Sequence, residues 1–192
     1  MAKSPKFSFH PVTPERWPDL VRLFGERGAC GGCWCMAWRL KHAAWKAGKG
    51  ESNKLALQTI VERDDRPGLL AYAGDEPIGW ISVAPREEFV ALGRSRILAP
   101  VDETPVWSIS CLFVARPYRR QGVSVKLIDA AVKFAAKQGA TAVEAYPYVP
   151  YSETMPAAFA WTGIASAFEQ AGFAEVARRS DKRPIMRRAC NG

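Results

Sequence analysis

The sequence predicts a mixed α/β fold, and three observations support this expectation. First, residues 106–139 read as a buried strand, a basic glycine-containing turn and an amphipathic helix laid end to end. Second, short apolar segments of strand type lie on both sides of this unit, and some are separated only by tight turns. Third, other segments before and after it carry helical periodicity. Strands and helices are thus interspersed along the chain.

The N-terminal half is expected to hold a strand, two helices and a hairpin. Thr13 and Pro14 look like an N-cap followed by a proline at the first helical position. Gly74 and Asp75 form a tight turn between two apolar runs. The expected elements are a strand at 7–10, helices at 14–26 and 52–63, and hairpin strands at 69–73 and 77–83.

The C-terminal half begins with a charged loop, residues 85–105, and leads into the central strand at 106–114. The following helix shows a one-sided apolar face made by Ser124, Leu127, Ile128, Ala131, Phe134 and Ala135, and Gly139 ends it. Thr162 is expected to cap the last helix. The remaining elements are a strand at 142–146, a helix at 163–171 and a terminal hairpin at 173–177 and 184–188.

Composition indicates a single globular domain over residues 1–192, with a core of about 7–189. The chain has 192 residues and 48% hydrophobic content, which excludes a disordered protein. It has no apolar run of roughly 18 residues, and its start lacks the apolar segment of a signal peptide, so we expect a cytoplasmic protein without a membrane span. Five cysteines, an odd number, favour free thiols in a reducing compartment.

A formal charge of +8 raises nucleic acid as a partner. The basic residues cluster only weakly, and no recognition helix, zinc finger or RNA-binding signature accompanies them. The densest group is C-terminal and comprises Arg178, Arg179, Lys182, Arg183, Arg187 and Arg188. An acidic cofactor would account for part of the excess charge. We therefore do not expect nucleic acid as the partner.

The turn after the central strand has the composition of an anion site. Arg119, Arg120, Gln121, Gly122, Val123 and Ser124 place guanidinium groups and free backbone N–H groups at a helix N-terminus, which suits a phosphate or pyrophosphate. A Walker A loop would need Gly-Lys-Ser/Thr, and a dinucleotide-binding turn would need two more glycines. The alternative is an ordinary strand, solvated basic turn and helix.

Arg119-x-x-Gly122-x-Ser124 behind Leu112-Phe113-Val114 resembles the acyl-CoA signature of the GNAT superfamily of N-acyltransferases. Ser124 departs mildly from the usual final Gly/Ala. The element order also matches, and the resemblance implies a mostly antiparallel sheet flanked by helices, with a V-shaped splay between the central strands after a bulge. It further implies acetyl-CoA as co-substrate, with the pantetheine arm on backbone groups of Leu112, Phe113 and Val114. The pyrophosphate would contact Arg119, Arg120, Gln121, Gly122, Val123, Ser124 and Val125.

Acyl transfer to an amine requires a base for the amine and an acid for the departing thiolate. Glu144, in the strand beside the cofactor strand, is the candidate base; an exposed strand position is the alternative, and Glu87, Glu88, Asp102 and Glu103 lie in a neighbouring loop. The family often places a tyrosine four residues before its Gly-Phe pair, where this chain has Phe168. Tyr146, Tyr148 and Tyr151 are the substitutes, and we favour Tyr151.

The segment Cys30-x-x-Cys33-x-Cys35 has three interpretations. Zinc needs four ligands, and only two histidines and no second cysteine pair are available, so we expect no metal site. A redox Cys-x-x-Cys motif normally opens a helix after a strand, which is not the order here. The resemblance places this segment at the acceptor pocket, where Trp34, Met36, Trp38 and Trp107 would bind an apolar or cationic amine. A core plug is the alternative.

Together these features predict an acetyl-CoA-dependent N-acetyltransferase that acts on a primary amine of a small molecule by direct attack on the thioester. The alternative is a noncatalytic acyl-CoA-binding or nucleic-acid-associated module. A homodimer is compatible with the sequence. The acceptor amine and the acyl-chain preference are not encoded in any motif.

Overall fold

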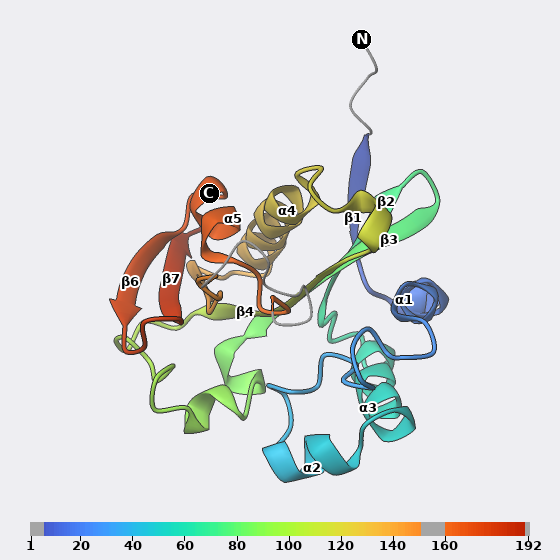
Figure 1. The fold of residues 1–192 in the computed structure, drawn as a ribbon, viewed down its shortest axis with the longest axis horizontal. Coiled ribbons are helices and arrows are strands. Elements are labelled where there is room, and N and C mark those ends of the chain that lie inside the picture. Colours follow the sequence, from blue (N-terminus) through green and yellow to red (C-terminus); the bar gives the residue numbers. More distant parts are fainter. Residues whose placement is uncertain (1–5, 151–159, 191–192) are drawn as a thin grey trace.

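A computed structural model describes residues 6–150 and 160–190 of the chain. In this part, seven strands form one sheet in the order β1-β2-β3-β4-β5-β7-β6 (Figure 1). All neighbouring strands are antiparallel except β4 and β5, which run parallel. The expected mixed α/β fold with a mostly antiparallel sheet is therefore confirmed. The strands are β1 (Phe7–Pro11), β2 (Gly68–Ala73), β3 (Glu76–Pro85), β4 (Trp107–Val114), β5 (Ala142–Ala145), β6 (Ala174–Arg178) and β7 (Pro184–Ala189).

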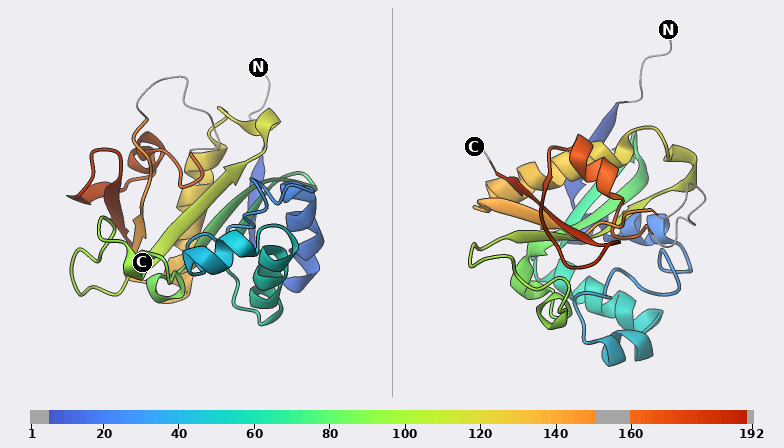
Figure 2. Two further views of the ribbon diagram at one scale, coloured as in Figure 1. Left: turned by 60° about the horizontal axis from the view of Figure 1, so that its bottom comes forward. Right: turned by 60° about the vertical axis from the view of Figure 1, so that its left-hand side comes forward.

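Helices cover both faces of the sheet, as the views in Figure 2 show. The helices are α1 (Trp17–Phe24), α2 (His42–Ala47), α3 (Glu51–Glu62), α4 (Val123–Lys137) and α5 (Ala165–Gln170). On one face, α4 buries the expected apolar stripe, including Leu127, Ile128 and Ala131, against the sheet, and α5 adds Phe168 to the same core. On the other face, α1 and α3 pack Phe24 and Leu57 against strand residues such as Trp80. The structure thus has three layers, with β4 near the middle.

Two helix boundaries differ from the sequence expectation. The first predicted helix is divided, because a 3-10 turn (Pro14–Arg16) precedes α1 and Gly25, with a φ of 62°, ends it. The last helix starts at Ala165 with Ile164 as N-cap, so the expected capping role of Thr162 is wrong. The Thr162 hydroxyl is buried and instead accepts a hydrogen bond from Arg183. Helix α2 was not predicted at all.

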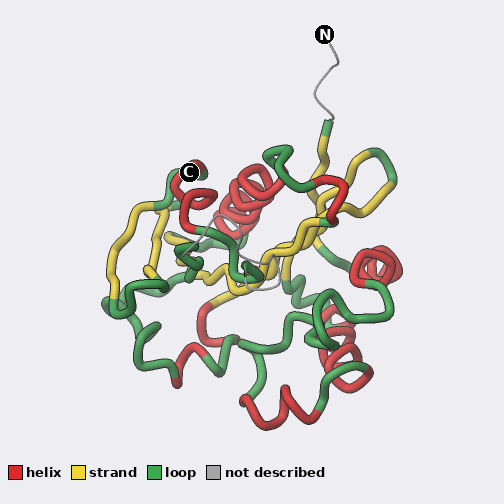
Figure 3. Tube along the Cα trace, in the orientation of Figure 1, coloured by secondary structure: helices red, strands yellow, loops and turns green. Residues whose placement is uncertain are grey.

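The central strand carries the irregularity on which the site depends. The register between β3 and β4 shifts between Ser82 and Val83, so Ser110 is an extra residue on β4. On its other side, β4 pairs with β5 only over residues 107–109 and 143–145. Beyond this point β4 continues to Val114 without β5 beside it, which is the expected splay. Residues 86–106, which feed into β4, form a loop with two short 3-10 turns (Figure 3).

Among the described residues, no helix combines the length and the apolar character needed to cross a membrane.

Candidate functional site

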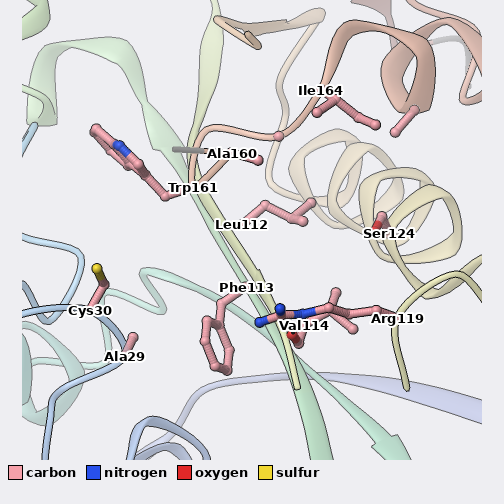
Figure 4. A pocket seen from close by; sticks show the side chains of 12 residues that line it. Ala29, Cys30, Leu112, Phe113, Val114, Arg119, Ser124, Ala160, Trp161 and Ile164 are labelled. Atoms are coloured by element: carbon pink, nitrogen blue, oxygen red, sulfur yellow. Dashed lines mark hydrogen bonds between the residues drawn. The ribbon is translucent and has the colours of Figure 1, made fainter. Parts of the chain in front are cut away.

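A cavity of about 380 Å³ opens where β4 separates from β5 (Figure 4). It reaches both faces of the sheet, because its lining comes from α4 and α5 on one side and from the loop after α1 on the other. The residues that line it are Ala29, Cys30, Leu112, Phe113, Val114, Arg119, Ser124, Ala160, Trp161, Gly163, Ile164 and Ala167. Five of the expected cofactor residues, Leu112, Phe113, Val114, Arg119 and Ser124, are therefore brought together around one space.

The N-terminus of α4 meets one end of this cavity. Its N-cap, Gly122, has a φ of 74° in the left-handed region, and no side chain caps the helix. The first helical bond is donated by the Lys126 N–H to the Gly122 carbonyl. The N–H groups of Val123, Ser124 and Val125 precede that bond and so have no acceptor within the helix. This end of the helix presents uncapped donors and the positive end of its dipole, which suits an anion.

Gly122 is required by its conformation and not by crowding. A Cβ at this position would meet no atom of the described chain within 4 Å, whereas a φ of 74° is unfavourable for a residue with a side chain. Arg120, at a φ of 60°, shares this left-handed geometry. The turn is thus bent so that open space lies in front of the helix N-terminus.

The side chains of the turn divide into two groups. Arg119 donates from Nε to the Val114 carbonyl at 2.9 Å, which holds its guanidinium along the cavity wall (Figure 4). Gln121 points back and donates to the Pro117 carbonyl at 2.8 Å. Val123 is buried in the core beneath α4. Only Arg119 and Ser124 among the expected turn residues offer side chains to the cavity, so any contact of the others would come from the backbone.

The backbone of β4 faces the gap at alternate residues. The Leu112 N–H points away from β3, because it donates to the Trp161 carbonyl at 2.7 Å across the gap. Strand alternation then directs the backbone of Val114 to the gap and that of Phe113, opposite Trp80, to β3. Phe113 consequently contributes its ring to the cavity but not its backbone, which differs from the expectation that all three residues offer backbone groups.

The expected substrate wall of Trp34, Met36, Trp38 and Trp107 is not formed. Trp34 and Met36 are buried in the core under α1, where the Trp34 ring lies 5.4 Å from that of Phe24. Trp107 packs on Phe134 of α4 at 6.0 Å, on the opposite face of the sheet.

Trp38 lies near the cavity, with its ring 5.9 Å from that of the lining residue Trp161. For Trp34 and Met36 the core-plug alternative describes the structure.

Glu144 sits in a buried ionic cluster and not in the cavity lining. Its Oε1 accepts from Arg187 Nη2 at 2.7 Å and Nε at 3.1 Å. Its Oε2 accepts from the Tyr146 hydroxyl at 3.0 Å and lies 3.6 Å from Arg86 Nη1. The alternative of an exposed strand position is wrong, since 1% of the residue is exposed. With both oxygens engaged by donors, Glu144 has little free acceptor capacity for an amine proton.

The tyrosines after β5 also have structural partners. Tyr146 contacts Ser108 and Arg86, and burial together with the Glu144 charge raises the pKa of its hydroxyl well above the usual value. Tyr148 lies under the Arg183 guanidinium and forms a bridge with Ile164. Tyr151 lies outside the described residues. Neither Tyr146 nor Tyr148 lines the cavity.

Phe168, at the position where the resemblance implies a tyrosine, is fully buried. Its ring packs against Phe173 at 5.2 Å and crowds Gly163, where a Cβ would approach Phe168 Cε2 to 2.6 Å. Gly163 therefore needs to be glycine both for this contact and for its φ of 80°. Because Gly163 lines the cavity, the edge of the Phe168 ring lies directly behind the cavity wall.

Several lining residues were not predicted as site residues. Trp161, Gly163, Ile164 and Ala167 belong to the segment that returns toward β4 after β5, and no motif marks them. Cys30 begins the cysteine segment and Ala29 precedes it, and the unusual composition of that segment was the only signal. All five cysteines are free thiols in the structure. Within the described residues, no three His, Cys, Asp or Glu side chains gather closely enough to hold a metal ion.

Solved acetyltransferase structures share this fold at low sequence identity. A PaiA N-acetyltransferase from Thermoplasma acidophilum in complex with coenzyme A has a TM-score of 0.55 and 15% identity, with 96% of this chain and 99% of that chain covered. A ribosomal-protein-S5-alanine acetyltransferase from Vibrio fischeri has a TM-score of 0.55 and 11% identity, covering 96% and 93%. An aminoglycoside acetyltransferase in complex with coenzyme A has a TM-score of 0.52 and 18% identity, covering 96% and 95%.

No curated protein sequence matches the chain significantly. The sequence profile described as the acetyltransferase (GNAT) family, however, matches residues 34–157, nearly two thirds of the chain. This range includes β4, the glycine turn and α4, the three parts that form one wall of the cavity. The chain belongs to the GNAT family of acetyltransferases.

Proposed function

We propose that this protein transfers the acetyl group of acetyl-CoA to a primary amine of a small molecule. The observation that carries the proposal is the continuity between the uncapped N-terminus of α4 and the gap beside β4. One elongated ligand with a pyrophosphate at one end and an amide-containing arm would use both features. Coenzyme A has these parts, and two of the structural neighbours are complexes with it.

The pyrophosphate is proposed to lie against the turn. The N–H groups of residues 123–125 would donate to its oxygens, and Arg119 would add charge through its terminal nitrogens, since its Nε already serves Val114. The pantetheine arm would then run along β4 and use the gap-facing backbone of Val114 and Leu112. The Leu112 N–H already donates to the Trp161 carbonyl, so the arm has to replace this hydrogen bond before it can accept one from Leu112.

The acceptor is proposed to approach from the side of β4 on which Ala29, Cys30 and Phe113 lie. The rings of Phe113 and Trp161 suit an apolar or cationic amine, and a cavity of about 380 Å³ suits a small one. The reaction needs a neutral amine nitrogen that attacks the thioester carbonyl. The tetrahedral intermediate then expels the thiolate, and the ammonium proton is lost as the thiolate gains one.

The reaction also needs an acid and a base. In the described part of the cavity lining, no carboxylate and no tyrosine is present. We keep Tyr151 as the proposed acid, and Glu144 as the sequence-based candidate for the base, although its hydrogen bonds favour a structural role. Cys30 lines the cavity, but direct transfer gives it no covalent part, so Cys30→Ser should retain turnover.

The alternative of a nucleic-acid-associated module receives no support from the C-terminal arginines. Arg178 pairs with Glu175, Arg187 with Asp102 and Glu144, and Arg188 with Asp129. These side chains are committed to intramolecular ion pairs and would have to break them to contact phosphates. A noncatalytic acyl-CoA-binding module would bind acetyl-CoA in the same way but would not transfer its acetyl group.

A matched pair of glycine substitutions tests the cofactor site. Gly122 and Gly139 lie at the two ends of α4, both have a left-handed φ, and both leave a Cβ free of contacts within 4 Å. Glutamate at either position should cost a similar ~1–2 kcal/mol of folding free energy from the backbone. Acetyl-CoA should raise the melting temperature of the wild type and of Gly139→Glu, because a ligand selective for the folded state stabilises it.

Gly122→Glu should lose that rise, because it places bulk and negative charge where the pyrophosphate is proposed. Equal shifts in the two variants would refute the cofactor site. Turnover is tested separately with a panel of small amines and N-terminal peptides by thiol release. Binding of acetyl-CoA without thiol release from any amine would favour the noncatalytic alternative, and release with peptides alone would refute the small-molecule acceptor.

A further inference from the structure

Two cysteines that are far apart in the sequence meet behind the central strand. The Sγ atoms of Cys35 and Cys111 lie 2.8 Å apart, although 76 positions separate the residues. Both side chains are buried, and Trp80 donates from Nε1 to the Cys35 sulfur at 3.2 Å. Cys35 belongs to the loop after α1, and Cys111 lies in β4 immediately before Leu112. This contact therefore connects the loop on the acceptor side with the strand that borders the cavity.

The loop backbone is bent specifically at the residue that presents the sulfur. Trp34 and Cys35 have φ values of 47° and 52°, an uncommon left-handed conformation for two consecutive residues with side chains. The bend is held by tertiary packing, because the Trp34 ring lies directly against Gly28. A Cβ added at Gly28 would lie only 2.3 Å from Trp34 Nε1. Strained backbone that is held in this way is typical of functional positions.

We propose that Cys35 and Cys111 are a site of oxidative modification, at which a peroxide converts the two thiols into a disulfide between the loop and β4. One thiolate attacks a peroxide oxygen, which gives a sulfenic acid and releases the first product as water when the peroxide is hydrogen peroxide. The second sulfur then attacks the sulfenic sulfur, forms the S–S bond and releases a second water. Two thiols and one hydrogen peroxide thus give one disulfide and two waters.

The geometry allows this bond with little rearrangement. A disulfide places its sulfurs about 2.05 Å apart, so the two atoms need to approach by less than about 1 Å. The reaction should be slow at neutral pH, because the hydrogen bond with Cys35 and burial raise the pKa of the Cys111 thiol. A raised pKa leaves a small thiolate fraction, so the rate should increase as the pH rises from about 7 to 9.

The disulfide should stabilise the fold, because it closes a long loop in the unfolded chain. Such a loop gives an increase in melting temperature on the order of 10 °C for a chain of this size. This inference does not depend on acetyl transfer and would hold for a noncatalytic protein with the same fold.

The test is to expose the full-length protein to hydrogen peroxide and to map its peptides without reduction. Cleavage after Arg27, Arg39, Arg96 and Arg119 places Cys35 in residues 28–39 and Cys111 in residues 97–119. We expect these two peptides to be joined and lighter by two hydrogen atoms than the sum of the reduced peptides. A reductant should separate them and reverse the rise in melting temperature.

Variants identify the sulfur involved, because Cys30 and Cys33 share the first peptide. The double variant Cys30→Ser/Cys33→Ser, and Cys190→Ser as a distant control, should keep both the cross-link and the thermal shift. Cys35→Ala and Cys111→Ala should each lose both, and either one alone suffices if the other fails to fold. A cross-link that disappears in Cys30→Ser/Cys33→Ser would overturn the proposal. So would full oxidation of the exposed Cys30 without any link to residues 97–119.

Discussion

The two ends of the central strand differ in how completely the fold satisfies their polar groups. At the Val114 end, the strand leaves its neighbour and the helix that follows begins without a side-chain cap. At the Trp107 end, Ser108 contacts the Tyr146 hydroxyl, which in turn donates to Glu144, and two arginines complete the cluster. The Val114 end therefore has hydrogen-bond donors available for a ligand, whereas the polar groups at the Trp107 end are already hydrogen-bonded to one another.

This difference separates binding groups from structural groups better than residue type does. Glu144 and Tyr146 are chemically suited to acid and base catalysis, yet their oxygens are occupied by neighbours. The backbone N–H groups at the start of α4 carry no distinctive side chain, yet they have no acceptor within their own helix and no side-chain cap. Unsatisfied polarity next to a cavity is therefore the stronger indication of a ligand site.

The largest effect that would test this comparison is expected at Glu144. Glu144→Gln keeps the shape but removes the charge that faces Arg187 and Arg86. It leaves Arg86 beside a neutral amide and Arg187 with Asp102 as its remaining carboxylate, which should cost about 3 kcal/mol. For a chain of this size the melting temperature should fall by roughly 10 °C. Thermal unfolding followed by circular dichroism measures this loss.

Asp102→Asn is the matched control, because Asp102 pairs with the same Arg187 but is exposed. It should lower the melting temperature much less than Glu144→Gln does. If instead Glu144→Gln folds with unchanged stability and loses 10²-fold or more in kcat, Glu144 is the base and the structural interpretation is wrong.

A second effect separates the tyrosines by their catalytic contribution. Tyr151→Phe keeps the ring and removes the hydroxyl, so the loss of a general acid should reduce kcat on the order of 10²-fold with little change in KM. Phe168→Tyr places a hydroxyl next to Gly163, which lines the cavity. This variant tests whether the tyrosine that the family often has at this position can act as the acid. Near wild-type kcat in Tyr151→Phe, with no gain from Phe168→Tyr, would indicate protonation by solvent.

A third, smaller effect is expected at Tyr146. Tyr146→Phe removes the hydroxyl that links Ser108, Arg86 and Glu144. A net loss of about 1 kcal/mol in stability should follow, with kcat changed by less than the Tyr151 variant changes it. Denaturant unfolding gives the first quantity and steady-state kinetics the second. A large loss of kcat at unchanged stability would instead show that the Tyr146 hydroxyl takes part in catalysis.

The sequence predicted the open end of β4 well, because its signals are local. Strand composition, a glycine at the turn and the 3.6-residue periodicity of α4 all lie within residues 106–139, and the structure reproduces each of them. On the same helix, Asp129 and Lys133 lie four positions apart in the sequence and form an ion pair at 2.7 Å.

The acceptor side was predicted poorly, because its geometry depends on contacts between distant segments. The extra residue Ser110 shifts the alternation of β4, so Trp107 faces α4 whereas Cys111 and Phe113 face the opposite layer. The family resemblance implies a bulge in this strand, but no pattern in the sequence places it at Ser110. Likewise, the partners of Glu144 come from residues 86, 146 and 187, and a period-two pattern cannot show whether a buried acid is paired.

The smallest effect concerns the Leu112 N–H, which faces the gap and already has an acceptor within the protein. The Trp161 carbonyl accepts from the Leu112 N–H, and stacking of the Trp161 ring near Trp38 helps to hold it there. Trp161→Ala should loosen this contact and free the N–H for the proposed pantetheine arm. A net hydrogen bond is worth about 0.5–1.5 kcal/mol, so acetyl-CoA should bind up to about tenfold more tightly.

Isothermal titration of acetyl-CoA measures this change, and Trp107→Ala is the control, because Trp107 packs on Phe134 away from the cavity. Trp107→Ala should lower stability and leave the dissociation constant unchanged. Weaker binding in Trp161→Ala would show that contact between the Trp161 ring and the ligand adds more binding free energy than competition from the Trp161 carbonyl removes. In that event the ligand site at the Val114 end of β4 would include the segment that returns after β5. The two ends of the strand would then differ further, since only the Val114 end would bind a ligand.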